Sequence, residues 1–227
     1  MEATLLLARR PAGAEPQGWL PRSLAALALR FRDARVRLFA ADVDAADLGP
    51  GAIVPPPASF DTVVLVERAR STWSAPLRPT AERDDALAWL SGARGYRVGV
   101  RELRARPGRP RPAERSPGFV FVATAVRAPS LAHDAFDAHW RDRHAPLALV
   151  HHAGLCGYEQ LSVSAALTAG APAIDGVALL HFADAESYRT RFYDSDAGRA
   201  AIAADTRRFL DLPRCEAALL GEHWARP

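Results

Sequence analysis

The chain of 227 residues is 49% hydrophobic and 24% charged, proportions that exclude a mainly disordered protein. The net charge is only +3 although every basic residue is an arginine, and the lack of lysine excludes Schiff-base catalysis and a phosphate-loop lysine. No apolar run reaches the ~18–20 residues that cross a bilayer, and the N-terminus lacks the order of a signal peptide, so the sequence predicts a cytoplasmic protein without a membrane partner.

The first half of the chain predicts elements in the order β-α-β-β-α-β. Leu20, Leu24 and Leu27 recur at helical spacing. Pro21, at the start of this series, favours a helix that begins near the proline. Apolar and polar residues alternate between residues 35 and 41, as in a half-buried strand. Strands are expected at residues 4–8, 35–41, 62–66 and 96–103, and helices at residues 19–31 and from the N-cap Thr80 to Leu90.

A basic, proline-rich tract at residues 104–117 separates the two halves. Its composition cannot pack a core and predicts a solvated, extended linker. A nucleic-acid-binding arm is the alternative, but the tract lacks interleaved aromatic residues and glycine-rich repeats. We therefore expect no nucleic-acid partner.

The second half repeats the same order of elements. Strands are expected at residues 119–126, 155–163, 174–182 and 215–223, and helices at residues 131–143, capped by Ser130, and 185–210, broken near Asp194. The sequence thus predicts an α+β fold of two ferredoxin-like repeats, residues 1–103 and 118–227. Helices would cover one face of each four-stranded sheet and leave the other face exposed. Pairing the two exposed faces within the chain gives an intrachain α/β barrel. The protein would be a monomer with an internal pseudo-dimer, or a homodimer.

The segment that is richest in chemistry lies in the helix at residues 131–143 and just beyond it. Phe136, Trp140 and His144 follow one another at intervals of four and share a helical stripe. Pro146 should end or kink the helix at His144, where the helix dipole would favour the imidazolium. His144 suits general acid/base catalysis, and the alternative is a histidine that only caps the last carbonyls. Trp140 is expected in the core, or as the apolar wall of a pocket.

Three more residues are candidates for binding a polar group of a substrate. Tyr158 would present a phenol from its strand. His181 lies on a strand that is buried on both faces, which makes it a pocket residue or a core residue with a hydrogen-bond partner. His223 on the last strand is the third candidate, whereas His151 and His152 are expected to form an exposed pair.

Support for a metal or a cofactor is weak in this sequence. His133 and Asp137 have the i, i+4 spacing of paired ligands, with His144 as a third, but no HExxH motif accompanies them. Cys156 and Cys215 stand alone and are expected to be buried, because a free thiol packs as a small hydrophobic residue. Haem ligation by a single histidine stays open. We expect no cofactor and no metal.

A motif that spans the predicted catalytic helix and the following strand resembles the EthD-like family of dimeric α/β-barrel proteins. It comprises Phe136-x3-Trp140-x3-His144-Ala-Pro-Leu147, followed by Gly154-Leu155 and Tyr158. The resemblance extends over residues 119–224, whereas the first half matches only in its order of elements. It implies a barrel of two ferredoxin-like units, a small-molecule cavity between sheet and helices, and a catalytic role for His144. Relatives in the wider superfamily run many reactions, so the resemblance indicates the fold better than the chemistry.

These features predict a cofactor-independent enzyme that acts on an apolar, aromatic or polyketide-like small molecule by acid/base chemistry at His144. The reaction would be a lyase or isomerase step, such as dehydration, decarboxylation, cyclisation or isomerisation. The substrate-binding set would be Phe136, Trp140, Tyr158, His181 and His223. One site per chain is expected, because the helix at residues 19–31 has no histidine, tyrosine or carboxylate. Two alternatives stay open: a non-catalytic binding or accessory protein, and a cofactor-free monooxygenase.

Overall fold

The computed structural model describes residues 1–43, 45–67, 85–107 and 111–226 of the chain. The first half comprises β1 (Glu2–Ala8), α1 (Pro16–Arg30), β2 (Arg35–Ala40), η1 (Ala45–Leu48), β3 (Thr62–Glu67), η2 (Asp85–Gly92) and β4 (Arg94–Arg104). The second half comprises β5 (Phe119–Ala125), α2 (His133–His139), η3 (Trp140–His144), α3 (Ala145–His151), β6 (Leu155–Ala166), β7 (Gly176–Phe182), α4 (Ala185–Arg191), α5 (Asp196–Phe209), η4 (Leu212–Arg214) and β8 (Ala217–Arg226). The predicted α+β class is confirmed.

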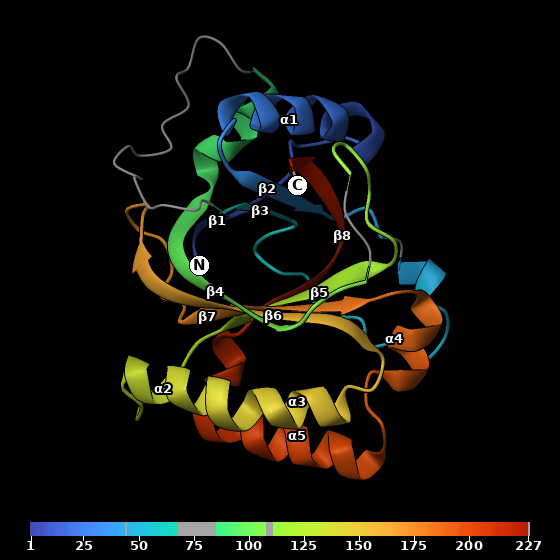
Figure 1. The fold of residues 1–227 in the computed structure, drawn as a ribbon, viewed down its shortest axis with the longest axis vertical. Coiled ribbons are helices and arrows are strands. Elements are labelled where there is room, and N and C mark those ends of the chain that lie inside the picture. The colour runs from blue at the N-terminus through green and yellow to red at the C-terminus, as the bar shows by residue number, and fades with distance from the viewer. Residues whose placement is uncertain (44, 68–84, 108–110, 227) are drawn as a thin grey trace.

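Eight strands within the described residues close into an antiparallel barrel, in the order β1-β3-β2-β8-β5-β7-β6-β4. The first half supplies β4-β1-β3-β2 and the second half β8-β5-β7-β6, so the four strands have the same relative order in both. The halves meet at two seams, where β2 pairs with β8 and β4 pairs with β6. Figure 1 looks into this ring, with α1 on one side and α2, α3 and α5 on the opposite side.

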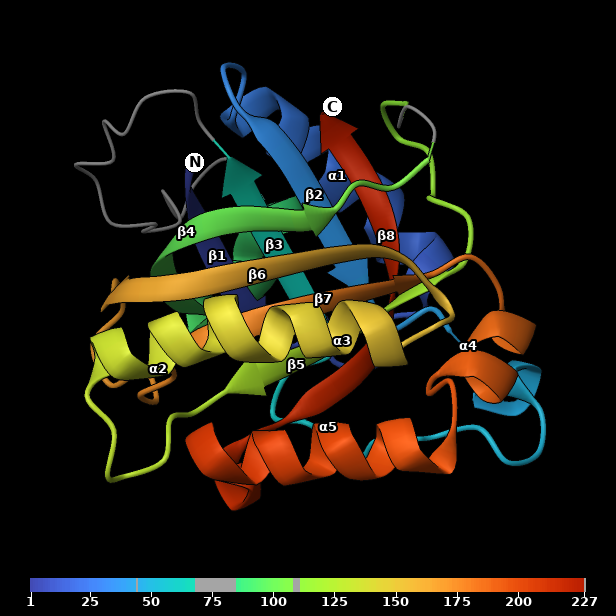
Figure 2. The same ribbon diagram turned by 60° about the horizontal axis from the view of Figure 1, so that its bottom comes forward.

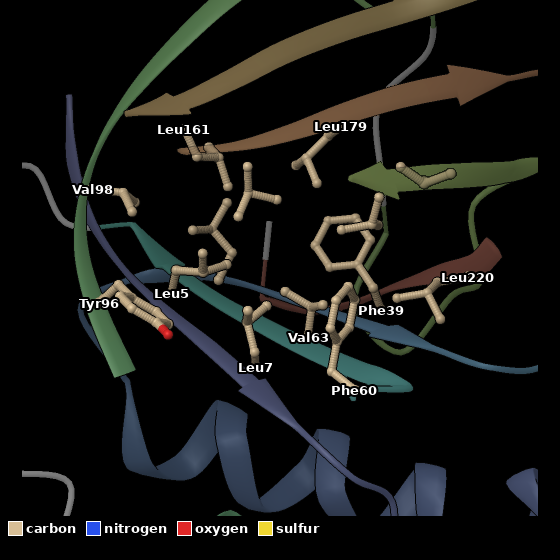
Figure 3. Packing of buried hydrophobic residues seen from close by; sticks show 14 of the residues in the cluster. Leu5, Leu7, Phe39, Phe60, Val63, Tyr96, Val98, Leu161, Leu179 and Leu220 are labelled. Atoms are coloured by element: carbon tan, nitrogen blue, oxygen red, sulfur yellow. The ribbon is translucent and has the colours of Figure 1, made fainter. Parts of the chain in front are cut away.

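Apolar side chains from both halves fill the centre of the barrel. Strand β3 is buried along its whole length, because one of its faces lines the interior and the other packs under α1. The interior residues include Leu5, Leu7, Phe39, Val63, Leu161, Leu179 and Leu220, which converge in Figure 3. Since the two halves share this core, either half alone would expose an apolar sheet face.

The helices of the first half differ in detail from the sequence-based expectation. Helix α1 begins at Pro16 rather than near Pro21, because a proline in the first turn loses no helical hydrogen bond. Pro21 lies inside the helix. The expected N-cap Thr80 lies outside the described residues, and η2 is a 3-10 helix.

Strand β2 is not the half-buried strand that its alternating pattern predicts. Closure of the barrel covers both of its faces: one packs under α1, and the other places Arg37 and Phe39 inside. Arg37 is only 2% exposed. Burial of an arginine requires compensating charges nearby, and these lie in the interior of the barrel.

The last two helices, α4 and α5, follow the predicted boundaries closely. The break near Asp194 separates α4 from α5, and the Ser195 hydroxyl caps α5 by accepting a hydrogen bond from Gly198 N at 3.0 Å. Ser130 is not the cap of α2, because the helix begins at His133 and its N-cap makes no side-chain hydrogen bond. Every helix in the described part of the chain is too short or too polar to span a bilayer.

The tract between the halves is partly built into the barrel wall. The N–H groups of Ala113 and Ser116 donate to the carbonyls of Trp224 and Glu222, at 2.6 and 2.8 Å. In return, Trp224 N donates to Glu114 O at 3.2 Å. Residues 113–115 are exposed, as expected of a solvated linker, and the segment 113–116 also satisfies the part of the β8 edge that β5 does not reach.

Paired histidines and both cysteines differ in exposure from the prediction. His152 is 4% exposed, and its Nδ1 lies 2.6 Å from the carbonyl oxygen of Phe192. His151 is half-buried, so the pair is not exposed. Cys156 and Cys215 are free thiols and only half-buried. The turn after α3 is thus anchored to the segment after α4 by a buried imidazole.

Acid should destabilise the fold through His152. Burial lowers the pKa of this histidine to about 4, whereas it returns to 6.5 in the unfolded chain. The unfolded state then binds more protons between these values, so the free energy of unfolding should fall by up to about 3 kcal/mol from pH 6.5 to 4. Urea unfolding at pH 4.5 and 7 measures this. The variant His152→Gln should lose that part of the pH dependence. If the free energy of unfolding of the variant fell as steeply with pH as that of the wild type, the role of His152 would be contradicted.

Candidate functional site

The helix that carries the predicted catalytic stripe does not end at His144. Residues Trp140–His144 form the π-helical turn η3, and α3 continues in line with α2 (Figure 2). Pro146 has no N–H, and its ring conflicts with the preceding turn of a regular α-helix. The wider π-turn lets the helix pass this proline, and Ala145 N donates to the Trp140 carbonyl. The expected helix end at His144 is therefore corrected to a local change of helix type.

Asp205 in α5 holds two histidines of the facing helix. Its Oδ2 lies 2.9 Å from Nδ1 of His144, and its Oδ1 lies 2.9 Å from Nε2 of His139. Because a carboxylate only accepts hydrogen bonds, Nδ1 of His144 carries the ring proton and Nε2 keeps its lone pair. A histidine base that is oriented by a carboxylate has this arrangement. The side chains of His144 and Asp205 are only 11% and 12% exposed.

Burial sets the charge state of His144. It lowers the pKa of this histidine below its ordinary value, because the hydrogen bond and the charge of Asp205 offset only part of the desolvation. The imidazole is therefore neutral at pH 7 and able to accept a proton. The prediction that the helix dipole favours the imidazolium is wrong, since His144 lies inside a continuing helix.

Aromatic rings form the apolar surroundings of the two histidines. The Phe209 ring centroid lies 4.8 Å from that of His139 and 5.0 Å from that of His144. Phe136 and Trp140 are buried in the same cluster as Phe209. Trp140 rests on the glycine that begins β7, where a Cβ would overlap the indole. This contact supports the interpretation of Trp140 as a core residue.

A glutamine on β6 connects the sheet to the π-turn. Gln160 Nε2 donates to the Trp140 carbonyl at 3.0 Å and to the Tyr158 hydroxyl at 3.1 Å. Its Oε1 accepts from Arg101 at 2.7 Å, and Arg101 also donates to Asp137 in α2 at 3.2 Å. Every hydrogen-bonding group of the buried amide is used, so Gln160 fixes the carbonyl that opens the π-turn.

Tyr158 lies on the same side of the sheet as the π-turn, and it is fully buried. Burial raises the pKa of its hydroxyl to about 12, although the hydrogen bond from Gln160 acts in the opposite direction. The phenol is therefore protonated at neutral pH, as a donor to a substrate would have to be. Gln160 donates to both the Tyr158 hydroxyl and the Trp140 carbonyl, so one side chain connects Tyr158 to the π-turn.

Replacement of Gln160 by leucine should destabilise the protein by about 1–3 kcal/mol. The change removes one of the two donors to the Trp140 carbonyl, and it takes the Gln160 partner from one Arg101 nitrogen and from the Tyr158 hydroxyl. Such losses in a buried site are more costly than the loss of a hydrogen bond between exposed groups. The matched control is Tyr158→Phe, which removes one hydroxyl and keeps the other contacts of Gln160. Urea unfolding of the two variants measures the difference, and equal stabilities would contradict the role of Gln160.

The other predicted site residues lie elsewhere. His181 faces the interior of the barrel, with Nε2 3.2 Å from Glu159 Oε1. His223 lies at the seam between β2 and β8, with Nε2 2.8 Å from Asp42. The expected substrate-binding set is therefore divided among three places, and only Phe136 and Trp140 share a cluster next to His144.

The three residues weighed as metal ligands are not gathered either. His133 bonds to Asp175 at 3.0 Å, and Asp137 bonds to Arg101. Within the described ranges, no group of three histidine, cysteine or acidic side chains is arranged to hold a metal ion.

A second polar group, which sequence reasoning missed, fills one end of the barrel. This barrel-end cluster consists of Arg37, Glu67, Arg106, Glu159, His181 and Glu222. Arg37 donates to both oxygens of Glu159 at 2.6 Å and lies 3.4 Å from Glu222. Its Nε lies 3.3 Å from Glu67 Oε2, but neither atom has an aligned hydrogen bond. The cluster joins residues of both halves.

Charges within the barrel-end cluster are unevenly compensated. Burial opposes ionisation of Glu159 and Glu222, yet Arg37 brings the pKa of each below its ordinary value. Burial raises the pKa of Glu67, and its attraction to Arg37 and Arg35 offsets only part of the increase. Glu67 is therefore the surplus carboxyl group of the cluster.

A groove of about 460 Å³ lies between α1 and η2, next to Trp19, Arg22 and Trp89. None of the predicted site residues lines this groove, which belongs to the first half of the chain. This groove and the histidine chemistry are therefore on different parts of the molecule.

Asp205 and Gln160 illustrate what the sequence could signal. Asp205 is 61 residues from His144, and no spacing rule connects residues on two different helices. Gln160 follows Tyr158 on the same face of β6, so strand alternation was the available signal. His139 belongs to the same helix as His144, but on a neighbouring face, and only the position of α5 explains its role.

Residues 128–213 match the family model of the EthD domain, which confirms the resemblance for the second half of the chain. A search of curated proteins finds no match. Among solved structures, an anthrone oxidase-like protein aligns with a TM-score of 0.60 at 13% identity, over 100% of this chain and 93% of the other. A protein from Lactobacillus acidophilus NCFM, provisionally described as a monooxygenase, aligns with a TM-score of 0.48 at 7% identity, over 99% and 94% of the two chains. The first of these likenesses supports the fold.

Proposed function

We propose that this chain, whose second half carries an EthD domain, is an enzyme that removes a proton from an apolar or aromatic small molecule. The observation that carries the proposal is the buried His144–Asp205 pair, in which a neutral imidazole is oriented by a carboxylate. The aromatic ring of Phe209 beside it suits a substrate of the same character. The π-turn at His144 supports the proposal, because such turns occur frequently at functional sites.

His144 acts as the base through Nε2 in this proposal. It takes a proton from an acidic C–H group and leaves a carbanion or enolate on the substrate, while Asp205 stabilises the imidazolium. The same imidazolium then returns the proton, either to a departing hydroxyl group, which leaves as water, or to another carbon. The first outcome is a dehydration and the second an isomerisation. In a cyclisation the carbanion attacks a carbonyl carbon of the same molecule, and the imidazolium gives its proton to the alkoxide that forms. In a decarboxylation the carbanion arises from loss of CO2 instead, and an imidazolium at His144 supplies the proton that replaces the carboxylate.

A second candidate begins with the same proton transfer. If the carbanion is aromatic and electron-rich, it passes electrons to O2 and the reaction becomes a cofactor-free oxygenation. The observation that favours it is the likeness of the fold to an anthrone oxidase-like protein. Both candidates require a base, so the His144–Asp205 pair supports them equally.

We further propose that the chain is a tandem of ferredoxin-like repeats that acts as a monomer in the cytoplasm with one site. The equal strand order of the two halves supports the repeats. Helix α1, in the position that corresponds to α2, carries no histidine, tyrosine or carboxylate after Trp19. The second half therefore supplies the acid/base chemistry, and the first half completes the barrel.

Exchange of acidic C–H groups with D2O tests the proposal. The wild-type protein is incubated in D2O with a panel of hydroxylated anthrones and aromatic β-diketones. Deuterium incorporation is followed by NMR. We expect exchange with at least one compound, and no exchange with the matched variant His144→Gln. Product analysis under air and under argon then separates oxygenation from lyase or isomerase chemistry. Binding of a compound without exchange in the wild type would instead identify a non-catalytic binding protein.

A further inference from the structure

The barrel-end cluster contains a cation that does not come from a strand. Arg106 lies between the halves and donates from both terminal nitrogens to the two oxygens of Glu222, with Nη2 3.0 Å from Oε1. The Ser116 hydroxyl donates to the same carboxylate at 2.7 Å. The side chain of Glu222 is 1% exposed and that of Arg106 is 22% exposed. A carboxylate inside the barrel is thus paired with a side chain that reaches it from the outside.

Two further contacts match the shape of a guanidinium. The Arg106 guanidinium carbon lies 5.8 Å from the ring centroid of Trp224, within the range of a cation–π interaction. Trp224 is itself held in place, because its Nε1 donates to the Ser116 hydroxyl at 3.1 Å. The stem of Arg106 crosses Gly157, where any Cβ would overlap it. A glycine floor, an indole wall and a two-oxygen acceptor therefore surround one planar cation.

The cluster also has more acceptors than its enclosed donors can satisfy. Without Arg106, the three carboxyl groups of Glu67, Glu159 and Glu222 face a single buried guanidinium, that of Arg37. Glu67 is 3% exposed, and its Oε2 lies near Arg35 and Arg37 but has no hydrogen-bond partner among the residues that the structure describes. A cation with several fixed donors suits this surplus better than an ammonium, which is a compact point charge and cannot bond to both oxygens in a planar fork.

We propose that this end of the barrel is a binding site for a monosubstituted guanidinium, which the chain's own Arg106 occupies. The acceptor Glu222, the indole of Trp224 and the floor at Gly157 define the ligand class. Occupation by Arg106 holds the segment between the halves against the barrel. A small alkylguanidinium takes its place when the arginine side chain is removed. The proposal is independent of proton transfer at His144, which lies on the helix side of the sheet.

Ethylguanidinium added to the variant Arg106→Ala tests the site. We expect the Tm of the variant to lie below that of the wild type and to rise saturably with millimolar ethylguanidinium, because a ligand that binds only the folded state stabilises it. The Tm of the wild type should not rise, since its own Arg106 competes at high effective concentration. Ethylammonium should have no such effect on the variant. The double variant Arg106→Ala/Glu222→Gln, which lacks the two-oxygen acceptor, should not respond to ethylguanidinium.

The proposal is overturned if ethylguanidinium leaves the variant unchanged, or if ethylammonium or the double variant gives an equal rise. If Arg106→Ala does not fold, its refolding yield with and without ethylguanidinium replaces the Tm, and no gain in yield overturns the proposal. Gly157→Ala gives a second measurement, because it keeps the arginine and fills the floor of the site. Its Tm should fall, and it should add little to Arg106→Ala in the double variant. A Gly157→Ala protein as stable as the wild type would also contradict the site.

Discussion

Replacement of Arg37 by methionine should abolish the native fold at neutral pH. The side chain is 2% exposed and is the shared partner of Glu67, Glu159 and Glu222. Removal of one partner from a buried ion pair typically costs about 3–5 kcal/mol, because it leaves an uncompensated charge. Here Glu159 loses both of its hydrogen bonds to Arg37, and Glu67 and Glu222 each lose one of their two cations. The whole stability of a domain is only about 5–15 kcal/mol. Circular dichroism and urea unfolding at pH 7.5 measure the loss.

A pH series distinguishes this electrostatic cause from a packing defect. Without Arg37, burial raises the pKa values of Glu67 and Glu159 above those of the unfolded chain. For these two groups the folded state then binds more protons than the unfolded state, so the difference in free energy of unfolding between the wild type and the variant should shrink as the pH falls toward 5. Arg37→Met combined with Glu159→Gln should recover part of the loss. A single variant within about 1 kcal/mol of the wild type at pH 7.5, or a difference from the wild type that is larger at pH 5 than at pH 7.5, would contradict the argument.

Turnover should fall by about 10²–10⁴-fold in the variant His144→Ala, the usual range for loss of a general base. The imidazole is 9% exposed and packs on Phe209, so this variant should also lose about 1–3 kcal/mol of stability. His144→Gln keeps most of the volume and a donor for Asp205, but it has no titrating group. It should therefore retain the fold and show a similar loss of turnover, measured as kcat/KM on the compound found by deuterium exchange.

The pH profile gives this second prediction its specificity. Burial lowers the pKa of His144, so wild-type kcat/KM should increase with pH, with the midpoint of the rise below the ordinary value of 6.5. Asp205→Asn removes the carboxylate that fixes the tautomer, and it should reduce kcat while the protein stays folded. His139→Gln changes the other partner of Asp205 and should have a much smaller effect. Equal turnover in wild type and His144→Gln would return His144 to a structural role.

Periodicity and element order predicted most of the fold, and they failed where the chain closes on itself. The stripe of Phe136, Trp140 and His144 was predicted because a helix places residues four apart on one face. The alternation at residues 35–41 predicted a half-buried strand, because an alternating strand in isolation shows one buried face. Only closure of the barrel reveals that its other face is also covered, so the barrel-end cluster has no local signal in the sequence.

The candidate site shows the same limit of local reasoning. The sequence predicts His144 as a candidate base, but the orientation of its ring depends on Asp205 from a different helix. Pro146 was expected to end the helix, and the chain instead widens one turn. This choice depends on Gln160, which binds the Trp140 carbonyl from the sheet beneath. The local sequence allowed either an end or a distortion of the helix at Pro146, and the tertiary contact with Gln160 accompanies the second.

The two seams of the barrel have a consequence for symmetry. Two identical chains in a ring would make both seams alike, and every residue would appear twice, on opposite sides of a twofold axis. In this single chain β2 pairs with β8 at one seam and β4 with β6 at the other, and residues 113–116 lie along only the first. Arg37 and its three carboxyl groups form one cluster in the chain, whereas a symmetric dimer would contain two equivalent clusters. A substitution in one half therefore has no counterpart in the other, and each side of the ring is free to vary by itself.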